Sequence, residues 1–134
     1  MTPSIKLLLV EDEAVIRLCL EDALTDGGFT IVTAATGEDA IRELENQLDN
    51  LAGLITDVRL GSGLDGWEVA RRARELNPYF PIVYSTADSA ADWPIQGVPN
   101  SIMLQKPFAN SQLLVAISTL LNDAAANPVR PIDE

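Results

Sequence analysis

Residues 5–13 read Ile-Lys-Leu-Leu-Leu-Val-Glu-Asp-Glu, an apolar run that stops abruptly at three acidic residues. The run lacks a regular alternation of apolar and polar positions, which is typical of a strand buried on both faces. Such strands belong to parallel sheets that carry helices on both sides. The stretch therefore predicts an α/β fold whose first strand ends in acidic residues.

Four further stretches predict strands of the same sheet. Runs rich in apolar and β-branched residues occupy positions 29–35, 51–56, 81–86 and 101–105. Segments with helical spacing or helix-start signals lie between them, so strands and helices alternate along the chain. This alternation predicts one doubly wound, five-stranded parallel sheet with helices on both faces and right-handed crossovers.

One helix is predicted between the first two strands. Its apolar residues recur at i, i+3, i+4 and i+7, and these are Ile16, Cys19, Leu20 and Ala23. Gly27 and Gly28 follow, and glycine is common directly after a helix. Because an apolar stripe at this spacing packs against the sheet, we expect Cys19 to be a small residue of the core.

The fourth crossover, between the last two predicted strands, is irregular. It contains Pro94 and Pro99, and a proline inside a helix interrupts its hydrogen bonds. We therefore predict that the fourth helix is short or irregular and confined to about residues 88–93.

The remaining helices define the limits of the domain. Thr36, followed three residues later by Asp39, predicts a capped helix start after the second strand. The last helix is predicted over residues 109–125, so that residues 1–125 form one domain. Residues 126–134 contain two prolines and end in acid, and we expect them to form a flexible tail.

Composition limits the possible functions. The 134 residues include 9 basic and 20 acidic side chains, which give a formal net charge of −11. This charge, with only two lysines, disfavours direct binding to nucleic acid or to an anionic membrane. One cysteine and no histidine exclude an internal disulfide, zinc sites built from Cys and His, and nucleophiles activated by histidine. No apolar run reaches the roughly 20 residues that span a bilayer, so we expect a soluble, cytoplasmic domain.

Polar residues follow the predicted strands at the edge of the sheet where α/β proteins bind their ligands. They are Glu11 and Asp12 after the first strand, Asp57 after the third, Thr86 after the fourth and Lys106 after the fifth. Three carboxylates in one place repel each other unless a cation lies among them, and oxygen ligands suit Mg²⁺. With Mg²⁺ and the lysine, the formal charges of the three carboxylates sum to zero.

A purely structural interpretation competes with a metal site. Glu11 and Asp12 are equally consistent with solvated residues that favour the start of a helix. Asp57 is harder to explain in this way, because it directly follows Leu-Ile-Thr at a buried strand end, where an unpaired carboxylate is costly.

The ordered set of residues at these strand ends resembles the receiver domain of two-component response regulators. The resemblance rests on Glu11-Asp12, Asp57, Asp65-Gly66, Thr86-Ala87 and Lys106-Pro107-Phe108, and it covers about residues 5–125. It implies a flavodoxin-like, CheY-like sheet with the strand order 2-1-3-4-5.

The resemblance also implies the chemistry of the site. Asp57 would accept a phosphoryl group from a phosphohistidine on a sensor histidine kinase or on a histidine phosphotransfer protein. Asp12, Asp57 and the backbone carbonyl of Arg59 would hold Mg²⁺, and Glu11 would assist through a bound water. Lys106 would pair with the phosphoryl oxygens.

Thr86 would donate a hydrogen bond to one of those phosphoryl oxygens. The implied function is a stand-alone, single-domain response regulator that changes which downstream protein it binds. It would be a phosphoacceptor rather than an enzyme, with self-catalysed phosphotransfer and slow autodephosphorylation as its only reactions.

Four residues near the site depart from the family pattern or lie where the family varies. Met103 stands three residues before the lysine, where many receivers carry a Tyr or Phe switch, and Tyr84 could take that part instead. Core packing explains both residues equally well. Arg59 and Asp88 each follow a site residue by two positions, and we hypothesise that they pair across the mouth of the pocket and restrict attacking water.

Three other functions compete with this one. A phosphohydrolase with an aspartate nucleophile would need a second Asp two residues after Asp57, where this chain has Arg59. A flavodoxin-like cofactor binder would need a phosphate-binding loop after the first strand, where residues 11–13 are acidic. A receiver-like module that binds its partners without phosphorylation stays open.

Overall fold

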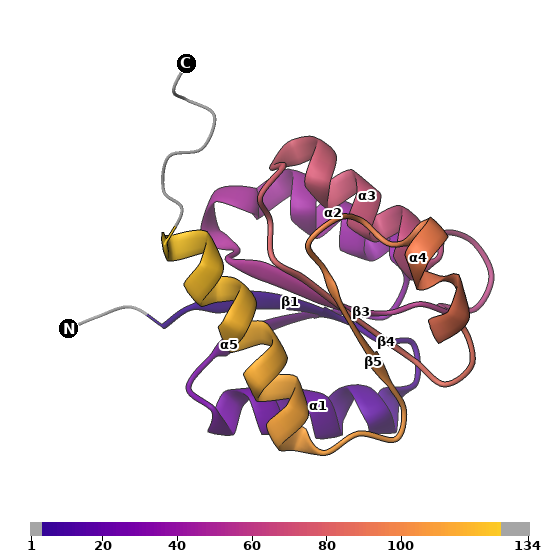
Figure 1. Ribbon diagram of the computed structural model, residues 1–134, viewed down its shortest axis with the longest axis horizontal. Coiled ribbons are helices and arrows are strands. Elements are labelled where there is room, and N and C mark those ends of the chain that lie inside the picture. Colours follow the sequence, from indigo (N-terminus) through magenta and orange to yellow (C-terminus); the bar gives the residue numbers. More distant parts are fainter. Residues whose placement is uncertain (1–3, 127–134) are drawn as a thin grey trace.

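The apolar run after Ile5 forms the first strand of a parallel sheet in the computed structural model, which describes residues 4–126 (Figure 1). In chain order the elements are β1 (Lys6–Val10), α1 (Ala14–Asp26), β2 (Thr30–Ala34), α2 (Gly37–Gln47), a 3₁₀ turn (Leu48–Asn50), β3 (Gly53–Asp57), α3 (Gly66–Leu76), β4 (Ile82–Thr86), a second 3₁₀ turn (Ala90–Asp92), α4 (Trp93–Gln96), β5 (Ile102–Gln105) and α5 (Asn110–Ala126). The strand order β2-β1-β3-β4-β5 is the predicted one.

The side chains of β1 alternate between two hydrophobic cores, one on each face of the sheet. Leu7 and Leu9 pack with residues of α1 and α5, whereas Leu8 and Val10 pack with residues of α2 and α3. All four are at most 1% exposed, and burying each one stabilises the fold by roughly 1.5–3 kcal/mol. Figure 1 shows the corresponding layers, with α1 and α5 on one face of the sheet and α2 and α3 on the other.

The prediction that Cys19 lies in the core is wrong, because its side chain is exposed. The buried residues of α1 are Leu20, Ala23 and Leu24. Leu24 was not part of the predicted stripe, and its inclusion moves the centre of the apolar face around the helix, away from position 19. At about 100° per residue, this displacement leaves Cys19 on the solvent side.

The helix of the fourth crossover is short, as predicted, but it lies later in the chain. Helix α4 has four residues and begins at Trp93, with Pro94 in its first turn. Proline is tolerated there because the first N–H groups of a helix have no partner within the helix. Gly97, in extended conformation, ends the helix.

The last helix extends slightly beyond the predicted domain boundary. Helix α5 continues to Ala126, one residue into the predicted tail. The rest of that predicted tail, residues 127–134, and residues 1–3 lie outside the described part of the chain. Within residues 4–126, no helix is both long enough and apolar enough to cross a membrane.

Candidate functional site

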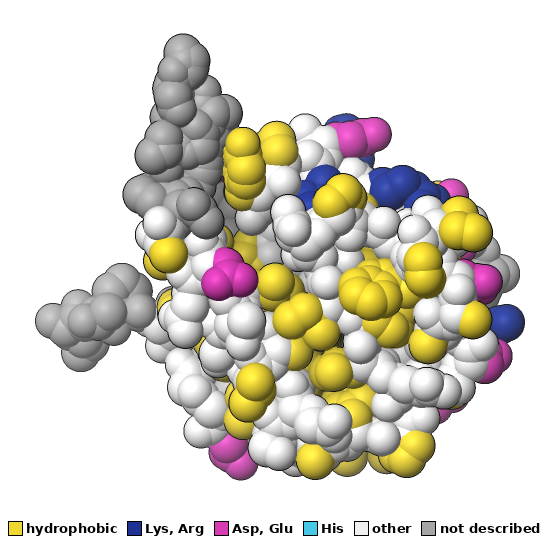
Figure 2. Space-filling model, in the orientation of Figure 1, with side chains coloured by type: hydrophobic (Ala, Val, Ile, Leu, Met, Phe, Trp, Pro, Cys, Tyr) yellow, Lys and Arg dark blue, Asp and Glu magenta, His cyan; other side chains and the backbone are white. Residues whose placement is uncertain are grey.

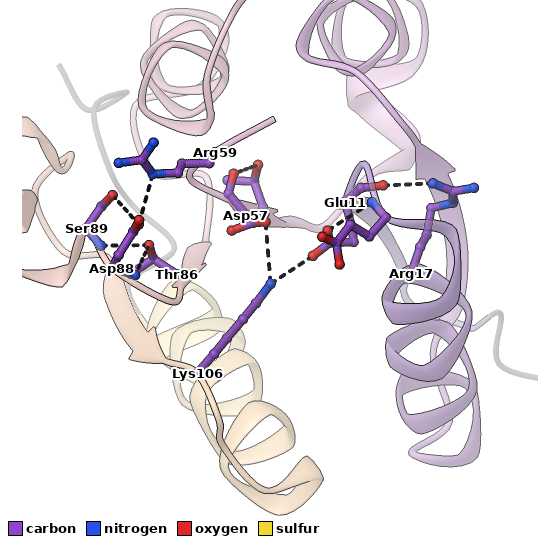
Figure 3. Close-up of polar contacts among 10 residues, drawn as sticks. Glu11, Arg17, Asp57, Arg59, Thr86, Asp88, Ser89 and Lys106 are labelled. Carbon is purple, nitrogen blue, oxygen red and sulfur yellow. Dashed lines mark hydrogen bonds and ion pairs between the residues drawn. The ribbon is translucent and has the colours of Figure 1, made fainter. Parts of the chain in front are cut away.

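The parallel register aligns the carboxyl ends of the central strands. Asp57, the last residue of β3, pairs with Ser85 of β4, and Thr86 pairs with Gln105 of β5. The polar residues that follow these strands therefore meet at one edge of the sheet, as the sequence predicts. Figure 3 shows the side chains that converge there.

Three carboxylates and one ammonium group form the centre of this edge. Carboxylate oxygens of Glu11, Asp12 and Asp57 all lie within 4.8 Å of one another. The Nζ of Lys106 lies 3.2 Å from Oε1 of Glu11 and 3.4 Å from Oδ2 of Asp57 (Figure 3). The structure thus brings together four of the predicted site residues, which come from three different strand ends.

Two of the three carboxylates are buried, and burial disfavours their charge. Glu11 is 1% exposed and Asp57 is 9% exposed. Burial raises the pKa of each carboxyl above its usual value, and the attraction of Lys106 offsets this only in part. Burial by itself would lower the pKa of Lys106, but the attraction of Asp57 and Glu11 outweighs it, so that the pKa of this lysine is raised.

This donor set fits a hard divalent cation. The three carboxylates supply oxygen ligands, and Mg²⁺ prefers carboxylates and water. Lys106 leaves the group with a formal charge of −2, which a divalent cation would neutralise. The predicted use of the Arg59 backbone carbonyl as a further ligand stays a prediction.

The loop from β3 to α3, residues 58–65, borders the site. The N–H of Gly66 donates to the carbonyl of Val58 at 2.8 Å, which closes the base of the loop. A side chain at position 66 would overlap the carbonyl oxygen of Asp57, so only glycine fits here. Asp65 and Glu68 then form a reciprocal capping box at the start of α3. This part of Asp65 was not predicted, although its spacing from Glu68 is the signal for a capping box.

A second network lies beside the carboxylates and includes the predicted pair. Nε of Arg59 donates to Oδ1 of Asp88 at 2.9 Å, and both side chains are more than half exposed. The same oxygen accepts from the hydroxyl of Ser89 at 3.0 Å. The hydrogen bonds from Ser89 and Arg59 lower the pKa of Asp88. The ion pair is therefore present, whereas its proposed effect on water stays a prediction.

Thr86 connects this network to β4. Its hydroxyl oxygen accepts from the N–H groups of Asp88 at 3.3 Å and Ser89 at 3.0 Å (Figure 3). Sequence reasoning missed Ser89, and it also missed Arg17, whose guanidinium donates to the backbone carbonyl of Glu11 at 2.9 Å. The Ser89 contact joins residues three positions apart, the spacing that also joins Thr36 and Asp39, whereas the Arg17 contact spans six positions and has no sequence motif.

The two residues considered as switches lie on neighbouring strands. Tyr84 of β4 pairs in register with Met103 of β5. Tyr84 is fully buried, its hydroxyl accepts from the N–H of Val98 at 3.1 Å, and its ring lies 4.7 Å from that of Trp67. Burial raises the pKa of the Tyr84 phenol. These contacts agree with the core-packing interpretation, and a switching role for either residue stays a prediction.

Comparison with known proteins gives a consistent result for sequence and for fold. A family model described as the response regulator receiver domain matches residues 7–118. Among curated proteins, the transcriptional regulatory protein AfsQ1 of Streptomyces coelicolor is 44% identical over 81 residues, which cover 60% of this chain and 34% of that protein. The response regulator MprA of Mycobacterium ulcerans is 31% identical over 134 residues, which cover 94% of this chain and 56% of that protein. The chain thus spans about a third and about half of these relatives.

Solved structures show the same architecture. The crystal structure of a response regulator receiver protein from Sinorhizobium medicae has a TM-score of 0.86 and 44% identity, and the match covers 89% of this chain and 95% of that one. The receiver domain of a sensor histidine kinase from Pseudomonas aeruginosa has a TM-score of 0.78 and 27% identity, and the match covers 90% of this chain and 99% of that one. That structure is described with a magnesium ion coordinated in its active-site cleft.

Proposed function

The chain belongs to the response regulator receiver domain family, and from this premise we propose that Asp57 accepts a phosphoryl group from a phosphohistidine. The observation that supports this most strongly is the position of Asp57 between two further carboxylates and Lys106. The donor would be a sensor histidine kinase or a histidine phosphotransfer protein.

The reaction transfers one phosphoryl group from a nitrogen to an oxygen atom and changes no oxidation state. A carboxylate oxygen of Asp57 forms a bond to phosphorus while the bond between phosphorus and the donor's imidazole nitrogen breaks. The bonding electron pair stays with that nitrogen, and the product on this chain is an acyl phosphate. In later hydrolysis, water takes the phosphoryl group and the Asp57 carboxylate is regenerated.

The surrounding residues would act on charge and orientation. Asp12, Asp57 and the backbone carbonyl of Arg59 would hold Mg²⁺, and Glu11 would assist through a bound water. The ion, when bound, would neutralise phosphoryl charge and orient the reacting carboxylate. Lys106 would shift from its carboxylate partners to the phosphoryl oxygens and stabilise their charge. The Thr86 hydroxyl can donate one hydrogen bond in addition to those it accepts, and we propose that it donates to a phosphoryl oxygen.

We further propose that the output is a change in protein binding rather than direct contact with DNA or membrane. The net charge of −11 disfavours binding to the negatively charged phosphate backbone of nucleic acid. Figure 2 shows apolar side chains over the face of α4, β5 and α5, where Ile95 and Val115 are 86% and 65% exposed. Exposed apolar groups of this kind favour a protein partner. A role in the cytoplasm is part of this proposal.

The mass of the intact protein tests the phosphoacceptor role. We would incubate the protein with a small acyl-phosphate donor and Mg²⁺, next to an EDTA sample and an Asp57→Asn variant. We expect one added phosphoryl group that requires both Mg²⁺ and Asp57. A full adduct in the Asp57→Asn variant would contradict the assignment. If no adduct formed and a beryllofluoride analogue failed to bind as well, the unphosphorylated binding module would be the better account.

A further inference from the structure

A contact outside the site connects helix α2 to the loop of residues 58–65. Glu38, in the first turn of α2, accepts a hydrogen bond at its Oε2 from the backbone N–H of Leu64, at 3.2 Å. The two residues are 26 positions apart in the chain. Neither the sequence motifs nor the proposed phosphotransfer chemistry uses this carboxylate.

The contact is closely packed, and glycines on both sides permit it. A Cβ atom at Gly37 would lie 2.6 Å from the carbonyl oxygen of Leu64 and 2.8 Å from its Cβ. A Cβ atom at Gly63 would lie 2.6 Å from Oε2 of Glu38. The backbone of the loop therefore rests directly on the start of α2, with no room for a side chain between them.

The loop contains two glycines whose conformational freedom a contact of this kind restricts. Gly61 and Gly63 both have positive φ, at 77° and 91°, and a segment with glycines has many alternative conformations to lose. The base of the loop is fixed by Val58 and Gly66. Glu38 fixes its far part.

The near part of the loop borders the acidic centre. A Cβ atom at Gly61 would lie 3.6 Å from Oδ2 of Asp12, so the loop backbone passes beside this carboxylate. Arg59, which pairs with Asp88, belongs to the same segment. Leu64 therefore lies only three positions along the chain from the point at which the loop borders a carboxylate of the acidic centre.

We infer that Glu38 is a positioning residue, which holds the loop of residues 58–65 against the acidic centre and so increases its affinity for Mg²⁺. This inference rests on the proposed function, because it assumes that the carboxylates bind Mg²⁺. The residue acts through the hydrogen bond to Leu64 and not through its charge. Its amide analogue should therefore replace it, because a glutamine oxygen accepts the same bond.

Calorimetric titration of Mg²⁺ into the full chain tests this inference with three variants. Glu38→Ala removes the acceptor, and we expect Mg²⁺ affinity to fall by about three- to tenfold. Glu38→Gln keeps an acceptor and should stay within about twofold of the wild type. Asp39→Ala is the matched control, since this side chain lies in the same helical turn but pairs with Arg42, and it should leave the affinity unchanged.

Amide hydrogen exchange of the metal-free proteins gives a second readout. We expect faster exchange in residues 60–65 of Glu38→Ala, with the wild-type rate in Asp39→Ala. Equal affinity losses in all three variants would indicate a charge effect and overturn the inference, as would unchanged exchange in Glu38→Ala. Wild-type protein that binds no Mg²⁺ would overturn both proposals. Mg²⁺ binding with neither a phosphoryl adduct nor binding of the beryllofluoride analogue would overturn the proposed function alone.

Discussion

Replacing Asp57 by Asn should stabilise the metal-free protein. Asp57 is 9% exposed, and burial raises the pKa of its carboxyl above the usual 3.8. A raised pKa means that the ionised carboxylate is less stable in the folded protein than in the unfolded chain. Its contribution to stability is therefore lost as pH rises above 3.8 through the folded-state pKa. The variant has no charge to bury, so its advantage should grow from acidic towards neutral pH.

The size of the effect follows from the distances in the site. At an effective permittivity of about 20, Lys106 at 3.4 Å attracts Asp57 by about 4.9 kcal/mol, and buried Glu11, at most 4.8 Å away, repels it by about 3.5 kcal/mol or more. Exposed Asp12, in a more aqueous setting, adds about 1 kcal/mol of repulsion. The attraction of Lys106 and the repulsion of the two carboxylates nearly cancel. The remaining contribution is the cost of removing the Asp57 carboxylate from water, about 1–3 kcal/mol. We expect a gain of that size, or about 4 °C in Tm per kcal/mol.

Thermal denaturation in EDTA at pH 7 and at pH 4 measures this gain. Asp22→Asn serves as the control, because it removes the same charge from an exposed position of α1 and should leave Tm within about 2 °C of the wild type. Mg²⁺ should then raise the Tm of the wild type more than that of Asp57→Asn. An Asp57→Asn variant with a Tm equal to or below that of the wild type in EDTA would refute the reasoning.

Three further predictions concern the surroundings of the site. Arg59→Ala should speed hydrolysis of the acyl phosphate by up to about fivefold, which corresponds to about 1 kcal/mol of barrier; an unchanged rate in a single-turnover assay would count against a restricting role. Gly66→Ala should lower the free energy of unfolding in urea by about 3 kcal/mol, because its methyl group would overlap the Asp57 carbonyl; an unaltered midpoint would contradict this. Tyr84→Phe should cost about 1–3 kcal/mol in the same assay, since the buried N–H of Val98 loses its acceptor, and a neutral effect would show that this N–H finds another partner.

Much of the fold follows from local patterns, because a parallel sheet buries both faces of its strands. The run at residues 7–10 has no polar position, and all four residues lie in the two cores. Thr36 caps α2 through the N–H of Asp39, as the spacing indicates. The prediction for Cys19 failed because residue spacing does not fix the limits of the buried face of a helix. One further buried leucine, Leu24, shifts the centre of that face away from Cys19.

The site was predictable where it depends on strand ends and not where it depends on loops. Parallel register by itself brings Glu11, Asp57 and Lys106 to one edge, so their ion pairs follow from the order of the strands. The contact of Glu38 with the backbone N–H of Leu64 joins a helix to a loop 26 positions away. Which N–H group meets which side chain depends on the three-dimensional path of the loop, which no spacing along the chain records.

Mapping the phosphorylated residue tests the central claim most directly. After reaction with an acyl-phosphate donor and Mg²⁺, borohydride would reduce an aspartyl phosphate to homoserine, and peptide sequencing by mass spectrometry would locate the product. We predict homoserine at position 57 and none at Asp12 or in the EDTA sample. We also predict no 5-hydroxynorvaline, the reduction product of a glutamyl phosphate, at Glu11. A reduced residue at any other position, or a stable phosphoryl adduct that borohydride does not convert, would contradict the assignment of Asp57 as the phosphoacceptor.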